Sequence, residues 1–150
     1  MQLDQLPPRQ PFEESARLFL PKDHQSVARL FRHLHHQPQD PPITEEELRM
    51  VAMNPNCYVL EVDGEVVSTA STNGVGISAF QIIGVSTHPD HRNKGYARAV
   101  CAALTRAMWD AGARRCVLFT EIENVVAQAC YRKLGFSTTD EYWLARLEKP

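Results

Sequence analysis

The chain has 150 residues, of which 43% are hydrophobic, and its formal net charge is −2 at pH 7. This length suits one domain that buries about 70% of its unfolded surface without disulfides or metals. The balanced charge argues against general nucleic-acid binding, because the basic residues do not gather in a long run. No apolar stretch approaches the ~20 residues of a membrane span, and no signal-peptide pattern is present. We therefore expect a soluble, cytoplasmic protein whose partners include neither nucleic acid nor membrane.

The cysteines are widely spaced, and no C-x-x-C motif is present. Each one lies in an apolar neighbourhood: Cys57, Cys101, Cys116 and Cys130. Their even number leaves a disulfide open, but free thiols in the core are favoured for a chain without a signal peptide.

The first residues, 1–14, are polar and include three prolines, which predicts a flexible N-terminal arm. A single domain is then expected from residue 15 to residue 150. Residues 16–20 are compatible with a first strand. Asp23 is a suitable N-cap for the amphipathic helix that follows, and this helix should fray near His36, before Pro38.

Three histidines, His33, His35 and His36, lie near the end of this helix. Clustered histidines can bind a metal ion, but these lack i, i+4 spacing and nearby cysteine or carboxylate ligands at a recognised interval. A solvated helix end is therefore favoured. After a proline-rich connector, the segment 44–47 (Thr-Glu-Glu-Glu) is a capping box that opens a second, short helix.

The middle of the chain predicts three antiparallel strands. Asp63-Gly64 lies between the apolar segments 57–62 and 65–71 and predicts a hairpin with a type I′ turn. The segment 79–86 then pairs back after a flexible turn at residues 73–76.

A long helix follows, with apolar residues at helical spacing from Ala97, and it is ended by Gly112. The apolar segment 116–120 is typical of a buried strand, and the strand–helix–strand order implies parallel pairing. Asn124 caps a last helix that runs to Leu134 and ends at Gly135. Residues 136–147 can supply one or two closing strands.

The loop between the third antiparallel strand and the long helix has the properties of an anion site. The first four N–H groups of a helix have no intrahelical acceptor, and Gly95 allows a ligand to approach the backbone. Arg92, Lys94 and Arg98 add positive charge. Taken alone, a glycine with basic residues around it is more typical of an ordinary surface turn with a solvated basic cluster.

Two motifs together resemble one known family. Arg92-x-x-Gly95-x-Ala97 resembles the Q/R-x-x-G-x-G/A pyrophosphate loop of the GCN5-related N-acetyltransferases, the GNAT superfamily. Asn124, Tyr131 seven residues later and the triplet 134–136 (Leu-Gly-Phe) resemble the N-x(6)-Y-x-x-L-G-F pattern of the same family. The resemblance covers residues 15–147. It implies an α/β (α+β) single-domain fold with a mixed central sheet, an antiparallel N-terminal part, a splayed parallel strand pair and flanking helices.

The resemblance also implies acetyl-CoA as co-substrate and no metal. Backbone groups of the strand end would pair with the pantetheine arm, the loop would bind the pyrophosphate, and the capping Asn124 would also touch the cofactor. Asn93 departs from the glycine that many relatives have, but asparagine tolerates positive φ, so the loop should survive. The residues so implied are Val85, Ser86, Thr87, Arg92, Asn93, Lys94, Gly95, Tyr96, Ala97, Arg98 and Asn124.

Transfer of an acetyl group to an amine needs a base for the amine and an acid for the departing thiolate. The spacing of the family motif makes Tyr131 the acid; without the motif, this residue would be assigned as a core aromatic. Glu121 and Glu123 follow the buried strand at the edge where α/β sheets expose ligand sites. Glu121 is favoured as the base over Glu123, and either is also compatible with a solvated loop.

The sequence therefore favours an N-acetyltransferase that transfers the acetyl group of acetyl-CoA directly to a primary amine of a small molecule or protein. The alternative is a catalytically silent acyl-CoA-binding module of the same fold. A nucleotide-binding Rossmann domain is disfavoured, because the loop follows an antiparallel hairpin region rather than a first βα unit. Besides acetyl-CoA and an amine acceptor, a second copy of the chain in a homodimer is left open.

Overall fold

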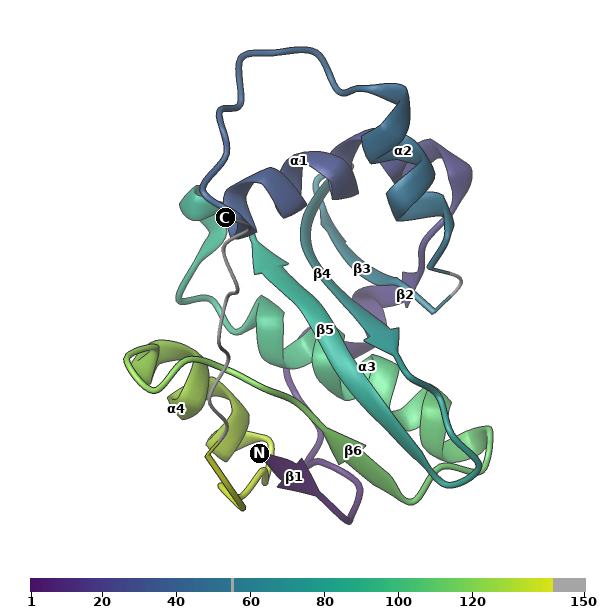
Figure 1. The fold of residues 1–150 in the computed structure, drawn as a ribbon, viewed down its shortest axis with the longest axis vertical. Coiled ribbons are helices and arrows are strands. Elements are labelled where there is room, and N and C mark those ends of the chain that lie inside the picture. The colour runs from purple at the N-terminus through teal and green to yellow at the C-terminus, as the bar shows by residue number, and fades with distance from the viewer. Residues whose placement is uncertain (55, 142–150) are drawn as a thin grey trace, which may run out of the picture.

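The computed structural model describes residues 1–54 and 56–141. Within these residues the chain forms one mixed six-stranded sheet in the order β1-β6-β5-β4-β3-β2, with helices on both faces (Figure 1). The strands are β1 (Gln2–Leu3), β2 (Ala16–Leu18), β3 (Tyr58–Val62), β4 (Glu65–Asn73), β5 (Ala79–Thr87) and β6 (Arg115–Val117). The helices are α1 (His24–Leu34), α2 (Glu45–Ala52), α3 (Tyr96–Asp110) and α4 (Val125–Lys133). The predicted fold class is confirmed.

The antiparallel part of the sheet forms where the turn chemistry predicts it. Asp63 (φ 52°) and Gly64 (φ 83°) both have left-handed backbone conformations, which a type I′ turn requires between β3 and β4. Strand β2 pairs antiparallel with β3, and β5 pairs antiparallel with β4. The predicted meander of three strands is confirmed and extended by β2.

The parallel pair β5 and β6 is joined only at one end. Three residue pairs link the strands, and the last pair is Gln81 with Val117. Strand β5 continues to Thr87, whereas the chain after β6 leaves the sheet and runs to α4 (Figure 1). The predicted splay of the parallel strands is therefore present, and the strand expected over residues 116–120 is shorter than predicted because the splay begins after Val117.

The helices bury the two faces of the sheet separately. Alternate residues on the strands point to opposite faces, so Val59 packs with α1 and α2 while Leu60 packs with α3. The α1–α2 side is a small cluster that includes Val27 and Val51. The α3 side is the larger core and includes Val100.

The predicted N-cap hydrogen bond is present at α2 and absent at α1. At α2 the predicted capping box is present: Thr44 Oγ1 accepts from Glu47 N at 3.2 Å, and Glu47 Oε2 accepts from Thr44 N at 2.8 Å. At α1 the side chain of Asp23 makes no cap bond. Its carboxylate instead accepts from Leu20 N at 2.7 Å and from the Arg17 guanidinium at 2.7 and 3.1 Å.

The N-terminal residues are packed on the domain, which differs from the flexible arm expected for residues 1–14. Strand β1 pairs antiparallel with β6, and Leu3 is 1% exposed. The following residues run along α3 to a 3₁₀ turn at Glu13–Ser15. Of the closing strands expected over 136–147, Ser137 makes an isolated bridge with Gln2, and 142–147 lie outside the described residues. No helix in the described part of the chain has the length and apolarity to cross a membrane.

Candidate functional site

The loop between β5 and α3 adopts two left-handed backbone conformations. Strand β5 ends at Thr87, a 3₁₀ turn spans Pro89–His91, and α3 begins at Tyr96. Asn93 has φ 62° and Gly95, the N-cap of α3, has φ 89°. Asparagine is among the non-glycine residues that best tolerate positive φ, so the departure from the family pattern at residue 93 leaves the turn intact.

This conformation leaves a row of backbone donors free. The first backbone N–H of α3 with an acceptor belongs to Ala99, which donates to Gly95 O at 3.1 Å. In residues 1–54 and 56–141, the backbone N–H groups of residues 93–98 donate no hydrogen bond. These donors lie at the positive end of the 15-residue α3. Free N–H groups and a helix dipole together bind anions such as phosphates.

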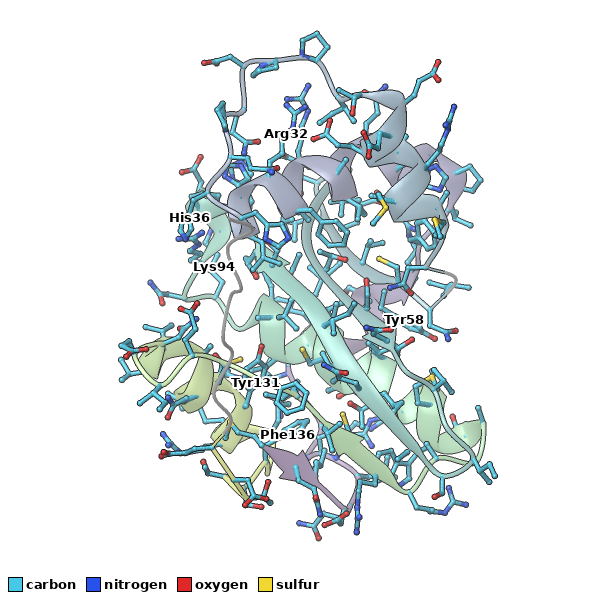
Figure 2. All side chains as sticks on the ribbon, in the orientation of Figure 1. Arg32, His36, Tyr58, Lys94, Tyr131 and Phe136 are labelled. Carbon is cyan, nitrogen blue, oxygen red and sulfur yellow. The ribbon has the colours of Figure 1, made fainter. Side chains whose placement is uncertain are left out.

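The basic side chains around the loop have different surroundings. Arg92 is exposed and its Nε donates to Thr87 O at 3.3 Å, so it braces the end of β5. Lys94 is exposed and has no hydrogen-bond partner within the described residues (Figure 2). Arg98 is half-buried and its Nε donates to Gln10 Oε1 at 3.0 Å. Tyr96 is buried and its side chain is part of the core, so only its backbone can face a ligand.

Gly95 is more constrained than the sequence suggests. From sequence, a helix start would tolerate alanine at this position. In the structure the residue is in the left-handed region, where a β-carbon is strained. A β-carbon would also lie 3.2 Å from Nη2 of Arg98. Glycine is therefore favoured by the left-handed backbone, and a side chain at this position would also require the Arg98 guanidinium to shift.

The adjoining half of β5 has an open edge. At a β-bulge, Gly84 and Val85 of β5 both lie opposite the single residue Ala70 of β4. Gly84 has φ 60°. Beyond Gln81, no strand of the described chain pairs with β5 on its β6 side. Unpaired backbone groups along this edge, after Ile82, can therefore pair with an extended ligand that carries amide groups.

The side chains at the end of β5 are used within the protein. Ser86 is buried, and its Oγ donates to Leu30 O of α1 at 2.8 Å. The hydroxyls of Thr87 and Ser68 lie 2.9 Å apart. Val85 packs against the larger core. Of the backbone groups expected to contact pantetheine, those of Val85 remain available, whereas Ser86 O accepts from Ser68 Oγ at 3.0 Å and Thr87 O accepts from Arg92 Nε at 3.3 Å.

Helix α4 carries the two residues of the second motif. Asn124 is the N-cap, and its Oδ1 accepts from Ala127 N at 3.1 Å. Tyr131 is 7% exposed, and its ring lies 5.9 Å from that of Phe136 between α4 and the sheet (Figure 2). Within the described chain, no hydrogen bond engages its hydroxyl. Burial, with a smaller effect from Cys101, raises the pKa of Tyr131, so the phenol is protonated at neutral pH.

The two candidate bases lie in the turn between β6 and α4. Glu121 and Glu123 are exposed, and the backbone carbonyl of Glu121 accepts from Asn124 N at 3.1 Å. Their carboxylates make no hydrogen bond or ion pair with another described residue. The structure brings both near the start of α4, but no direct contact joins either carboxylate to Tyr131.

The histidines are not grouped as a metal site. His35 and His36 are exposed at the end of α1, as predicted, but His33 is half-buried with its ring 5.1 Å from that of His88. Burial, and then the charges of His88 and Arg92, lower the pKa of His33. Over the described ranges, no three His, Cys, Asp or Glu side chains are arranged to hold a metal ion. All four cysteines are free thiols.

Sequence reasoning missed three features around the site. An isolated glycine inside a strand pattern signals a bulge, and Gly84 could have been identified in this way. Phe31 of α1 covers this bulge, because a β-carbon on Gly84 would lie 3.1 Å from its ring. Gln10 reaches the first turn of α3 from a distant part of the chain. Neither of these contacts has a local sequence signal.

The fold and the loop together define an α/β domain with an anion-binding helix start beside an opened parallel strand pair. The family model of the acetyltransferase (GNAT) family matches residues 21–136. The chain belongs to this family. The predicted superfamily is thus confirmed.

Individual relatives agree with this assignment. The chain is 28% identical over 149 residues to a mycothiol acetyltransferase of Cellulomonas flavigena. The aligned region covers 88% of this chain and 43% of the relative. The chain therefore spans less than half the length of this relative. A solved structure assigned as an acetyltransferase from Agrobacterium tumefaciens is 25% identical, with a TM-score of 0.75 over 89% of this chain and 99% of that one. Aminoglycoside N-acetyltransferase AAC(6')-Iy in complex with CoA is 20% identical, with a TM-score of 0.72 over 88% and 93% of the two chains, and supports the fold.

Proposed function

We propose that the protein is an acetyl-CoA-dependent N-acetyltransferase that transfers the acetyl group directly to a primary amine of a small molecule or of a protein. The observation that carries the proposal is the row of free N–H groups at residues 93–98 beside the open edge of β5. Membership of the acetyltransferase (GNAT) family supports it, as does the name of one relative, a mycothiol acetyltransferase.

The residues present fit acetyl-CoA. The pyrophosphate is an anion that needs several donors close together, and the left-handed Asn93 and Gly95 turn the backbone so that successive N–H groups are free. Lys94 supplies an unpaired cation beside them within the described chain. The pantetheine arm is an extended chain with amide groups, which the unpaired edge of β5 matches. Asn124 is assigned a cofactor contact through its side-chain N–H₂, because its Oδ1 is occupied by the cap.

When bound, acetyl-CoA supplies a thioester with an activated acyl carbon and a thiolate leaving group. The protein has to orient this group, accept a proton from the amine and deliver one to the leaving sulfur. Tyr131 holds a proton at neutral pH on a hydroxyl without a partner in the described chain, as the acid role requires. Glu121 is assigned as the base, directly or through one water, because its carboxylate is unpaired among the described residues and precedes Asn124 closely in the chain.

The proposal is tested by release of free thiol from acetyl-CoA over a panel of amines, beside a calorimetric titration with acetyl-CoA. The panel should include small primary amines, amino sugars and peptides with a free N-terminus or lysine. Binding together with amine-dependent thiol release is the expected result. Binding without turnover on any amine would favour the alternative, a silent acyl-CoA-binding module, and absence of binding would refute both.

A further inference from the structure

The N-terminal segment, residues 7–15, is fixed to the middle of α3. Glu13 is 5% exposed, and its carboxylate accepts from Arg106 Nε of α3 and from Gln10 N at 2.9 Å. Arg106 Nη2 also donates to Pro7 O at 2.7 Å. A buried carboxylate that accepts charge-assisted hydrogen bonds holds its surroundings in one arrangement. The segment is therefore a built part of the domain.

From this anchor the segment reaches the start of α3. Phe12 has φ 64°, an outlier for a bulky residue, and its ring packs edge-on against Tyr96 at 5.2 Å. Gln10 Oε1 accepts from Arg98 Nε at 3.0 Å. Strained backbone persists only where the surroundings determine it. Both contacts fall on the first turn of α3, directly beside the free N–H groups of residues 93–98.

The bond from Gln10 fixes how Arg98 presents its charge. Gln10 accepts a hydrogen bond only from Nε of Arg98. The two Nη groups of Arg98 have no acceptor among the described residues. Nη2 lies 3.2 Å from the position that a β-carbon of Gly95 would take, so the guanidinium is folded over the loop. Two unpaired guanidinium donors held over free backbone N–H groups match the geometry by which arginine binds a phosphate oxygen pair.

We propose that Gln10 is a positioning residue of the cofactor site, which holds Arg98 over Gly95 so that the guanidinium donates to the pyrophosphate bound at residues 93–98. This inference rests on the proposed binding of acetyl-CoA. It makes the N-terminal segment part of the site, although it lies outside the family motif. An ordered arginine loses less freedom on binding, so the bond between Gln10 and Arg98 should raise affinity without contacting the ligand itself.

A double-mutant cycle on the full chain tests the proposal, with acetyl-CoA affinity measured by calorimetric titration. Gln10→Met keeps the length of the side chain and removes the acceptor for Arg98, together with the exposed bond from Gln10 Nε2 to Pro8 O at 2.8 Å. Arg98→Met keeps the apolar stem and removes the guanidinium. The matched control is Gln5→Met, because Gln5 lies shortly before this segment, is exposed and makes no hydrogen bond within the described residues. Thermal unfolding of each variant verifies that it is folded.

Gln10→Met should weaken acetyl-CoA binding roughly threefold to tenfold, less than Arg98→Met, because the guanidinium remains but is no longer held. In the Arg98→Met background, Gln10→Met should have no further effect, since coupled residues are not additive. An unchanged affinity in Gln10→Met, no loss in Arg98→Met, or the same loss from Gln10→Met in both backgrounds would overturn the inference. Absence of acetyl-CoA binding by the unmodified protein would instead refute the proposed function.

Discussion

The phenol of Tyr131 is better suited to donate a proton to a ligand than to hold the structure through a hydrogen bond. Its ring is held by Phe136 and the larger core, while its hydroxyl has no partner within the described chain. Burial raises its pKa, which keeps the proton on the oxygen at neutral pH. A thiolate that formed in the same buried crevice would also become more basic, because burial disfavours its charge, and this narrows the difference in proton affinity between the two groups.

Tyr131→Phe should therefore lower kcat by roughly one to four powers of ten while acetyl-CoA affinity stays close to that of the unmodified protein. Thermal stability should change little, because the substitution removes a buried hydroxyl without breaking a hydrogen bond within the described residues. Amine-dependent thiol release, calorimetric titration and a melting curve measure the three quantities. Full turnover in the variant would assign Tyr131 to the core alone.

Gly95→Glu should give a folded protein that does not bind acetyl-CoA. The glutamate would be forced into a left-handed conformation at a cost of about 1–2 kcal/mol, and its negative charge would lie where the pyrophosphate binds. Calorimetric titration and thermal unfolding measure the two effects.

Gly112→Glu is the matched control for Gly95→Glu. Gly112 is also left-handed, with φ 106°, but a β-carbon there meets nothing within 4 Å, and it lies at the opposite end of α3. This control should lose a similar amount of stability and keep its affinity. Native affinity in Gly95→Glu would show that the phosphate loop is wrongly assigned.

At the scale of elements, the sequence predicted what short-range chemistry determines. The turn at Asp63-Gly64, the capping box at Thr44 and the cap at Asn124 are all formed by residues within a few positions of one another, and the structure has all three. Asp23 was predicted to cap α1, but its carboxylate is taken by Arg17, which propensity alone cannot anticipate. The predicted length of β6 was too great, because a run of apolar residues does not reveal where the strand separates from its neighbour β5.

A cluster of polar contacts between α1 and α2 fixes the loop that joins them. Arg32 is 5% exposed; its Nε and Nη2 donate to the two oxygens of Glu47 at 2.6 and 2.8 Å. Its Nη groups also donate to Pro41 O at 2.5 Å and Pro42 O at 2.9 Å. The planar fork of arginine is needed for all four bonds. Arg32 therefore couples the two helices through the proline-rich connector.

This arrangement predicts a pH-dependent stability. The Arg32 guanidinium, followed by Thr44 N, lowers the pKa of Glu47 from its ordinary 4.5 to about 2. A carboxylate with a lowered pKa in the folded state contributes stability that is complete above its unfolded pKa and is lost as pH falls through its folded pKa. Glu47→Gln should therefore be less stable than the unmodified protein at pH 7, and the difference should shrink from about pH 4.5 to about pH 2.

Urea unfolding of both proteins at pH 7 and near pH 2.5 measures this difference. The control is Glu45→Gln, because Glu45 pairs with Arg49 at 3.2 Å with both side chains exposed, and such pairs contribute little. A stability difference for Glu47→Gln that does not depend on pH would contradict the assigned ion pair.

At the scale of the whole molecule, the candidate site combines parts that differ in how well the sequence reveals them. The loop at Gly95 and the helix at Tyr131 carry motifs, so the sequence identified them. Gln10 meets Arg98 across 88 positions of the chain, and Arg106 meets Glu13 across 93. Contacts at such separation depend on how β1 pairs with β6, which no periodicity predicts. The N-terminal segment therefore looked like a flexible arm, although the structure packs it against α3.

Because the proposed site draws on β5, α3, α4 and the N-terminal segment together, acetyl-CoA should stabilise the domain as one unit. A ligand that binds only the folded state at 100 times its Kd adds about 2.7 kcal/mol. For a chain of 150 residues this corresponds to a rise in Tm of roughly 5 to 10 °C. A melting series with increasing acetyl-CoA measures the rise, and Gly95→Glu should remove it. A silent acyl-CoA-binding module would show the same rise in Tm, so the melting series tests the binding site and the Tyr131→Phe turnover experiment tests the chemistry. If acetyl-CoA did not raise the Tm of the unmodified protein, the assigned site would be contradicted.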